Sequence, residues 1–238
     1  MFQKLPKLLH SGIFVLLFLA TLTILPAQEA EKTTFRFSCV SFEPLSIADL
    51  HYREGKKYLP LNVASCNRSE PVPLRGMKFL EIHIPFTDDD GKPGYKLVGK
   101  ARIPKGTNLA LFFVHEKATP DGLPLTVSGI DDSLKTFPPG TFRFANLTNV
   151  PLRVKFGDTS SAIGAGGMTV VESKVSAEGG FLPLWITDTK GNKIYENRLW
   201  SQVSGRDMFF IGPPPQPGAR VSIMLLPQIV APERQPQP

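Results

Sequence analysis

The chain has few of the residues from which catalytic and metal sites are built. Its 238 residues include four histidines and two cysteines, and none of the close His or Cys spacings typical of zinc sites is present. No serine lies in a Gly-x-Ser-x-Gly motif, and the glycine-rich segment 164–167 is not followed by the Lys-Ser/Thr of a phosphate-binding loop. The sequence therefore predicts a non-catalytic protein without a cofactor.

One metal hypothesis remains open despite this scarcity. His83 and His115 each lie on a predicted strand, and Glu116 follows His115. If the two strands were neighbours, His83, His115 and Glu116 would form a zinc-type cluster, and the protein would be a metal-dependent hydrolase. Isolated histidines are more often solvated or hydrogen-bonded side chains than metal ligands, so this hypothesis is the weaker alternative.

Long helices have little room, because 20 glycines and 23 prolines are spread along the chain. Apolar residues instead alternate with polar ones, as at Phe35, Phe37 and Cys39, which is the period of a half-buried strand. The predicted strands cover residues 58–63, 78–84, 95–103, 109–115, 125–130, 152–156, 168–173, 182–187, 193–199, 207–211 and 221–226. Many short strands separated by turn residues predict an all-β protein built from antiparallel β-sandwiches.

The chain also repeats its own pattern. A Phe-Arg-Phe segment at 35–37 is followed by Pro-Leu at 44–45, and the same arrangement recurs at 142–144 and 151–152, an offset of 107 residues. This period is too long for a solenoid unit and matches a duplicated small domain. The sequence therefore predicts two tandem sandwich domains that arose by internal duplication.

The polar and proline-rich segments that separate the two repeats indicate where the domains begin and end. We expect an N-terminal β-sandwich domain at 28–132, a linker at 133–140 and a C-terminal β-sandwich domain at 141–230. The linker is short and contains the apolar Phe137, which favours domains that pack against each other. Residues 231–238 are polar and proline-rich, and we expect a disordered tail there.

Each half contains a strand with two adjacent phenylalanines, Phe112-Phe113 and Phe209-Phe210. Adjacent residues on a strand face opposite ways, so only one phenylalanine of each pair can face the core of its own sandwich. We expect the other to be covered, and at least one of them to lie at the contact between the domains.

The N-terminus has the layout of a secretory signal peptide. Lys4 and Lys7 precede an uncharged run at residues 12–25, and a small-residue cleavage site ends at Ala27. The run is shorter than the ~20 residues of a spanning helix, although an uncleaved anchor is the alternative. We therefore predict a signal peptide at 1–27, export to the periplasm or the extracellular space, and no stable membrane span after cleavage.

Two cysteines remain in the mature chain, Cys39 and Cys66. In an oxidising compartment two cysteines are more often paired than free, and a bond between them would close a loop of about 26 residues and contribute roughly 3 kcal/mol. The alternative is a buried thiol, because Cys39 shares its strand parity with Phe37. The sequence leaves both alternatives open.

The binding surfaces that the sequence suggests are aromatic. Trp185 lies on a predicted strand of the second half, and Trp200 follows the end of another. Both could present an aromatic platform to sugar rings, the chemistry of a carbohydrate-binding module. Strand aromatics are more often packing residues. The net charge of +6 is mild and its cations are scattered, so no nucleic-acid partner is predicted.

The segment that runs from Ile130-Asp131-Asp132-Ser133 to the Asn-Leu-Thr at 146–148 resembles exported bacterial all-β proteins of unknown function. In the second half, Asn-Leu at 146–147 followed by the strand at 151–154 is similar to the opening of periplasmic sandwich proteins, including the accessory protein of alginate O-acetylation. These resemblances imply a β-sandwich fold and no activity. We expect an exported, non-catalytic binding or assembly component of the cell envelope, whose partner is a protein or a polysaccharide.

Overall fold

The computed structural model describes residues 35–172, 174–176, 178–214, 216 and 221–230. The predicted signal peptide at 1–27 and the predicted tail at 231–238 lie outside the described residues. Contacts between residues group Thr34–Pro238 into one compact unit. Over the described ranges, no helix is long and apolar enough to cross a membrane.

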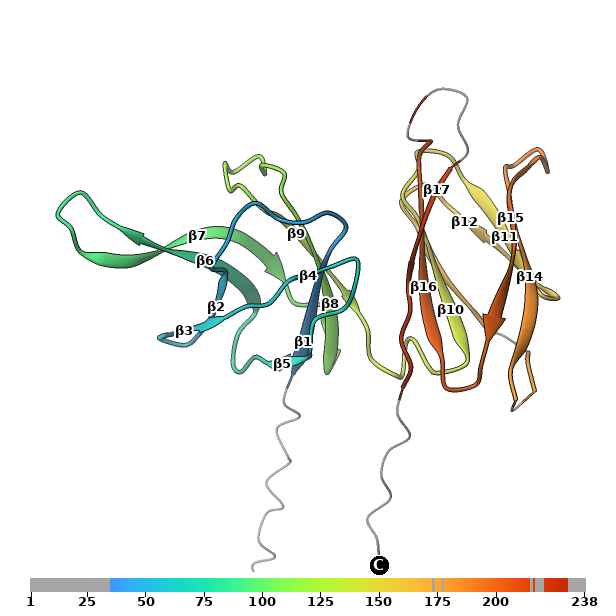
Figure 1. The fold of residues 1–238 in the computed structure, drawn as a ribbon, viewed down its shortest axis with the longest axis horizontal. Coiled ribbons are helices and arrows are strands. Elements are labelled where there is room, and N and C mark those ends of the chain that lie inside the picture. The colour runs from blue at the N-terminus through green and yellow to red at the C-terminus, as the bar shows by residue number, and fades with distance from the viewer. Residues whose placement is uncertain (1–34, 173, 177, 215, 217–220, 231–238) are drawn as a thin grey trace, which may run out of the picture. The chain divides into compact units, whose positions relative to one another are not determined.

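The described residues form strands and no α-helix, which confirms the predicted all-β class (Figure 1). The strands of the first half are β1 Arg36–Ser41, β2 His51–Glu54, β3 Lys57–Pro60, β4 Ala64–Ser65, β5 Val72–Pro73, β6 Phe79–Thr87, β7 Pro93–Arg102, β8 Leu109–His115 and β9 Thr126–Asp131. Those of the second half are β10 Thr141–Asn146, β11 Leu152–Phe156, β12 Thr159–Ile163, β13 Met168–Glu172, β14 Gly180–Thr187, β15 Lys193–Ser201, β16 Arg206–Gly212 and β17 Ser222–Leu226.

The strands form four sheets, two from each half of the chain. Sheet A has the order β4-β1-β8-β9, with β5 also paired to β1, and sheet B has the order β3-β2-β6-β7. Sheet C has the order β13-β10-β16-β17, and sheet D has the order β12-β11-β14-β15. No sheet combines strands from both halves among the described residues.

Within each half the two sheets share one hydrophobic core. In the first half, Phe37 and Phe112 of sheet A pack in one cluster with Tyr52 and Ile82 of sheet B. In the second half, the Phe142, Phe144 and Phe209 side chains of sheet C pack with those of sheet D. The burial of β11 follows the period of two, because Leu152, Val154 and Phe156 are buried and the residues between them are exposed. The packing of each half is therefore sandwich-like.

The sheets are not purely antiparallel, contrary to the prediction. β1 pairs with β8 in parallel, and β10 pairs with β16 in parallel. Between β1 and β8 the chain passes twice through sheet B, and between β10 and β16 it passes twice through sheet D. β8 then runs in the same direction as β1, and β16 in the same direction as β10. Hydrophobic alternation shows that a segment is a strand but not the direction in which it runs, so the sequence pattern could not reveal these parallel pairs.

The two halves have the same strand order. β1, β8 and β9 occupy in sheet A the places that β10, β16 and β17 occupy in sheet C. Sheet B and sheet D correspond in the same way, strand by strand. Two pairings differ. β4 runs parallel to β1 whereas β13 runs antiparallel to β10, and the pairing of β5 with β1 has no counterpart in sheet C. An origin by duplication, and the domain boundaries at 132 and 141, stay predictions.

A third hydrophobic cluster joins sheet A to sheet C. Phe113 of β8 and Phe210 of β16 meet with their ring centroids 5.2 Å apart, and Phe42 contacts both. Leu111, Met208 and Phe137 are buried in the same cluster. Their neighbours Phe112 and Phe209 face the cores of their own halves. The expected division of each phenylalanine pair between two environments is confirmed.

Buried charges hold the segment between the halves beside this third cluster. Arg206 is 1% exposed, and its guanidinium donates to the backbone carbonyls of Asp132 and Phe137 at 2.8 and 2.9 Å. The same guanidinium lies 3.3 Å from the Asp132 carboxylate, which Arg68 also contacts. Arg143 donates to the carbonyl of Asp131. Burial lowers the pKa of Arg206, and the Asp132 carboxylate opposes that shift.

The Phe137 ring lies between two of these cations. The Arg143 guanidinium is 4.4 Å from the ring centroid and that of Arg206 is 5.1 Å away, as in cation–π contacts. Further along, the Asn146 amide is fully buried and donates to the carbonyls of Val150 and Gly164. Phe137 and Asn146 therefore both have structural partners.

We expect Phe209→Ala and Phe210→Ala each to lower the free energy of unfolding by about 3–5 kcal/mol, because each removes a buried ring and leaves a cavity. Phe181, which is 58% exposed, is the matched control, and its alanine variant should cost less than about 0.5 kcal/mol. Urea unfolding of the three variants measures these differences. A Phe210→Ala variant as stable as the control would contradict the packing of sheet A on sheet C.

We expect Asp132→Asn to cost about 3–5 kcal/mol, because it leaves the buried guanidinium of Arg206 without its carboxylate. Asp121→Asn is the control, since Asp121 is exposed in a loop. Both variants can be compared by thermal and urea unfolding. Equal stabilities would show that the charge of Asp132 does not hold the segment between the halves.

Candidate functional site

The outer face of sheet D, opposite the second-half core, is the best candidate for a binding surface. Along β14 the residues alternate, and Leu184 and Ile186 enter the core. Trp185, which lies between them, therefore points outward. Cross-strand pairing places Lys155 of β11 and Glu196 of β15 on either side of Trp185.

Trp185 is held in place by charged neighbours on this outer face. Its indole Nε1 donates to the Glu196 carboxylate at 2.8 Å. The Lys155 and Lys193 ammonium groups lie 5.1 and 5.9 Å from its ring centroid, within cation–π range. Lys193 also pairs with Glu196 at 2.7 Å, and the hydrogen bond from Lys193 lowers the pKa of Glu196. The ring orientation is therefore fixed without burying the indole completely.

Trp200 is the more exposed tryptophan. Half of its surface is accessible, and it packs edge to face on Phe181, its cross-strand partner, with ring centroids 5.1 Å apart. Phe181 is itself 58% exposed. Two large rings in contact and open to solvent are unusual on a protein surface away from a binding site.

The charges on this face have mostly one sign. The four strands of sheet D contain the cations Arg153, Lys155, Lys193 and Arg198 and one carboxylate, that of Glu196. All five of these side chains belong to exposed residues. The face therefore combines aromatic rings with an excess of positive charge and would attract an anionic ligand.

Sequence reasoning named the two tryptophans and missed the residues around them. Phe181, Lys155 and Arg198 join Trp185 and Trp200 on this face only because three strands pair in this register. The alternation along 181–185 and 196–200 indicated which residues point outward. It did not indicate which residues of the neighbouring strands lie beside them.

The histidines do not form the predicted zinc-type cluster. His83 lies on β6 of sheet B, whereas His115 ends β8 of sheet A. Glu116 instead accepts hydrogen bonds from Ser46, which lower the pKa of the Glu116 carboxyl. Within the described part of the chain, no group of three or more His, Cys, Asp or Glu side chains could hold a metal ion. The hypothesis failed because the two strands are not neighbours.

His83 is buried beside Glu81, which the sequence did not suggest. It points away from the core, as its position between Ile82 and Ile84 predicted, yet it is only 6% exposed. Neither ring nitrogen has a hydrogen-bond partner. Its Nε2 lies 3.8 Å from the Glu81 carboxylate. Burial lowers the pKa of His83, and Glu81 opposes this shift.

Cys39 and Cys66 are not bonded to each other in the structure, and a disulfide between them stays a prediction. Cys39 is buried in the first-half core, and burial raises the pKa of its thiol. Cys66 is exposed, and its thiol donates to the backbone carbonyl of Phe42 at 3.1 Å. The two side chains occupy different environments, as the buried-thiol alternative required.

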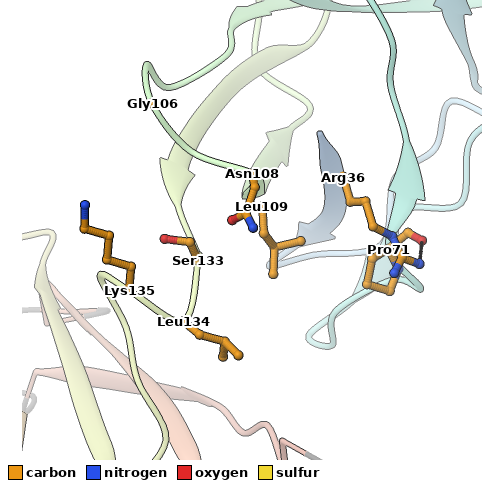
Figure 2. Close-up of a pocket in the computed structure, with 8 residues that line it drawn as sticks. All are labelled: Arg36, Pro71, Gly106, Asn108, Leu109, Ser133, Leu134 and Lys135. Atoms are coloured by element: carbon orange, nitrogen blue, oxygen red, sulfur yellow. Dashed lines mark hydrogen bonds between the residues drawn. The ribbon is translucent and has the colours of Figure 1, made fainter. Parts of the chain in front are cut away.

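A cavity of about 450 Å³ lies beside the start of β1 (Figure 2). Its lining consists of Arg36, Pro71, Gly106, Asn108, Leu109, Ser133, Leu134 and Lys135. Figure 2 shows Arg36 and Lys135 at opposite ends, with the Lys135 side chain extending away from the others. Arg36 donates to the carbonyl of Pro71 at 2.9 Å. The two cations do not converge, so this cavity is a weaker site than the outer face of sheet D.

No protein-family model matches this chain, and no curated protein is similar to it in sequence. The arguments about function therefore rest on the residues and on their arrangement.

We expect the stability of the protein to fall as the pH is lowered below about 6.5, where histidines of the unfolded chain take up protons. The folded state resists protonation of His83 and His115, because burial lowers the pKa of both. Their neutral forms therefore contribute stability above this pH that is lost below it. Urea unfolding between pH 5 and 8 should show a shallower decline for His83→Gln and for His115→Gln. Identical pH profiles for all three proteins would contradict this assignment.

Proposed function

We propose that this protein is an exported, non-catalytic binding component of the cell envelope, and that the outer face of sheet D binds an acidic polysaccharide. The observation that carries the proposal is the combination of Trp185 and Trp200 with four cations and one carboxylate on the strands of one sheet.

Both parts of the surface suit an acidic sugar. The C–H faces of a sugar ring are apolar and can pack flat on an exposed aromatic ring, as they would on Trp200 or Phe181. Lysine and arginine donate charge-assisted hydrogen bonds to carboxylate or sulfate groups. Lys155 and Arg198 lie on the strands on either side of β14 and would meet such groups.

The spacing of the rings favours a polymer over a single sugar. Trp200 pairs with Phe181, four residues along β14 from Trp185. Four residues of an extended strand span about 13 Å. A ligand that touches both tryptophans must therefore extend over several linked rings.

Export and envelope location are the parts of this proposal that depend on the signal peptide at 1–27. They are supported by its charge pattern and by the resemblance of the segment between the halves to exported bacterial proteins. An assembly role with an envelope protein is the second form of the proposal, since exposed rings also serve protein interfaces. The metal-dependent hydrolase has lost its support, because His83 and His115 lie in different sheets.

We expect the protein to bind a polyuronate and not a neutral glucan, with an affinity that falls as salt is added. Trp185→Ala and Trp200→Ala should each weaken binding at least tenfold, whereas Leu225→Ala on sheet C should not change it. Leu225 is 41% exposed and lies outside sheet D. Isothermal titration calorimetry measures the affinities, and circular dichroism checks the folding of each variant. If both tryptophan variants bind as tightly as the unmodified protein, sheet D is not the binding surface.

A further inference from the structure

Sheet B carries a pair of tyrosines that close over its outer face. Tyr58 belongs to β3 and Tyr95 to β7, the two edge strands of the sheet. Their rings stack with centroids 3.9 Å apart and planes 4° from parallel. The edge strands are three strand spacings apart, about 14 Å, so both side chains must lean inward across β2 and β6 to meet.

This stacking geometry is not the one that two isolated aromatic rings prefer. Offset or edge-to-face pairs with centroids about 4.5–7 Å apart are the favoured arrangements. The nearly parallel pair of Tyr58 and Tyr95 is closer than that. A ring inserted between them would stack on both tyrosines once the two side chains moved apart by the thickness of that ring.

His83, which Tyr58 contacts, has the Glu81 carboxylate 3.8 Å from its Nε2 as a polar neighbour. His83 is 6% exposed and neither ring nitrogen makes a hydrogen bond, although Tyr58 packs edge to face on it at 4.9 Å. Buried polar groups without a hydrogen bond are rare and destabilise the folded state. A ligand hydroxyl or carboxylate that reached His83 would remove this destabilisation.

A hollow and two cations lie beside the pair. A cavity of about 450 Å³ is lined by Tyr95, Phe86, Pro85 and Pro93, together with Thr87 and Gly94. This volume is in the range of small-molecule sites. Nearby, Lys100 and Arg53 pair with Glu81 at 3.0 and 3.4 Å. Around Glu81 the cations therefore outnumber the carboxylate, whereas the cavity itself adjoins the acidic turn at 88–90.

We propose that Tyr58 and Tyr95 form a clamp that opens to admit one ring of an acidic sugar, which hydrogen-bonds to His83 and places its carboxylate near Arg53 and Lys100. The ligand class rests on the function proposed for sheet D. The clamp itself does not, because it lies on another sheet and uses other residues. The protein then has two saccharide-binding faces, one in each half of the chain.

The test uses trigalacturonate as the probe and the full mature chain. A Trp185→Ala/Trp200→Ala protein isolates sheet B, and calorimetry should still show one bound probe per chain, against two for the unmodified protein. Adding Tyr58→Ala and Tyr95→Ala should weaken this remaining binding at least tenfold. Tyr58→Phe and Tyr95→Phe, which keep both rings, should retain it within about twofold, because stacking requires the ring and not the hydroxyl.

A second measurement of binding at the clamp requires no substitution in sheet B. In the Trp185→Ala/Trp200→Ala protein, the imidazole NMR signals of His83 should shift when the probe is added, and those of His115 should not. Unchanged His83 signals, or equal affinity after Tyr58→Ala and Tyr95→Ala, would overturn the clamp. If instead the two tryptophan substitutions leave the affinity and stoichiometry of the unmodified protein intact, the function proposed for sheet D fails while the clamp stands.

Discussion

The buried ion pair between Asp132 and Arg206 is the constraint on which the arrangement of the sheets depends. Arg206 begins β16 of sheet C, and Asp132 follows the last strand of sheet A. Their contact and the hydrogen bond to the carbonyl of Phe137 tie the segment between the halves to both sheets. A guanidinium that is 1% exposed cannot lose its carboxylate without a large desolvation penalty, so the pair also selects against other arrangements of this segment.

This constraint determines which surfaces are left for ligands. Sheet A and sheet C bury their outward residues against each other, as Phe113 and Phe210 show. Sheet B and sheet D have no such cover, and their outer faces carry exposed rings, Phe79 and Tyr95 on one and Phe181 and Trp200 on the other. Both proposed sites therefore lie on the sheet of each half that the third hydrophobic cluster does not use.

The sequence predicted the features that depend on adjacent residues, such as strand positions and the facing of side chains. It did not predict which strands, distant in the sequence, pair with each other. Period-two alternation placed strands at Phe142–Phe144 and Leu152–Phe156, and adjacency alone divided Phe209 from Phe210. The parallel pairing of β1 with β8, the partners of Trp185 and the burial of His83 all depend on which strands lie side by side. A spacing of 32 residues between His83 and His115 says nothing about that.

The segment that suggested a resemblance is informative about architecture and not about ligands. Phe137 packs between two guanidinium groups, and Asn146 fills its hydrogen bonds with backbone carbonyls, so both are committed to the fold. A chain can keep this segment, and with it the contact of sheet A with sheet C, while the outward residues of sheet B and sheet D change. Trp185 and Tyr95 lie on outer faces and are not part of either core. The side chains of this segment are therefore explained by the fold, and the bound ligand has to be argued from the two outer faces.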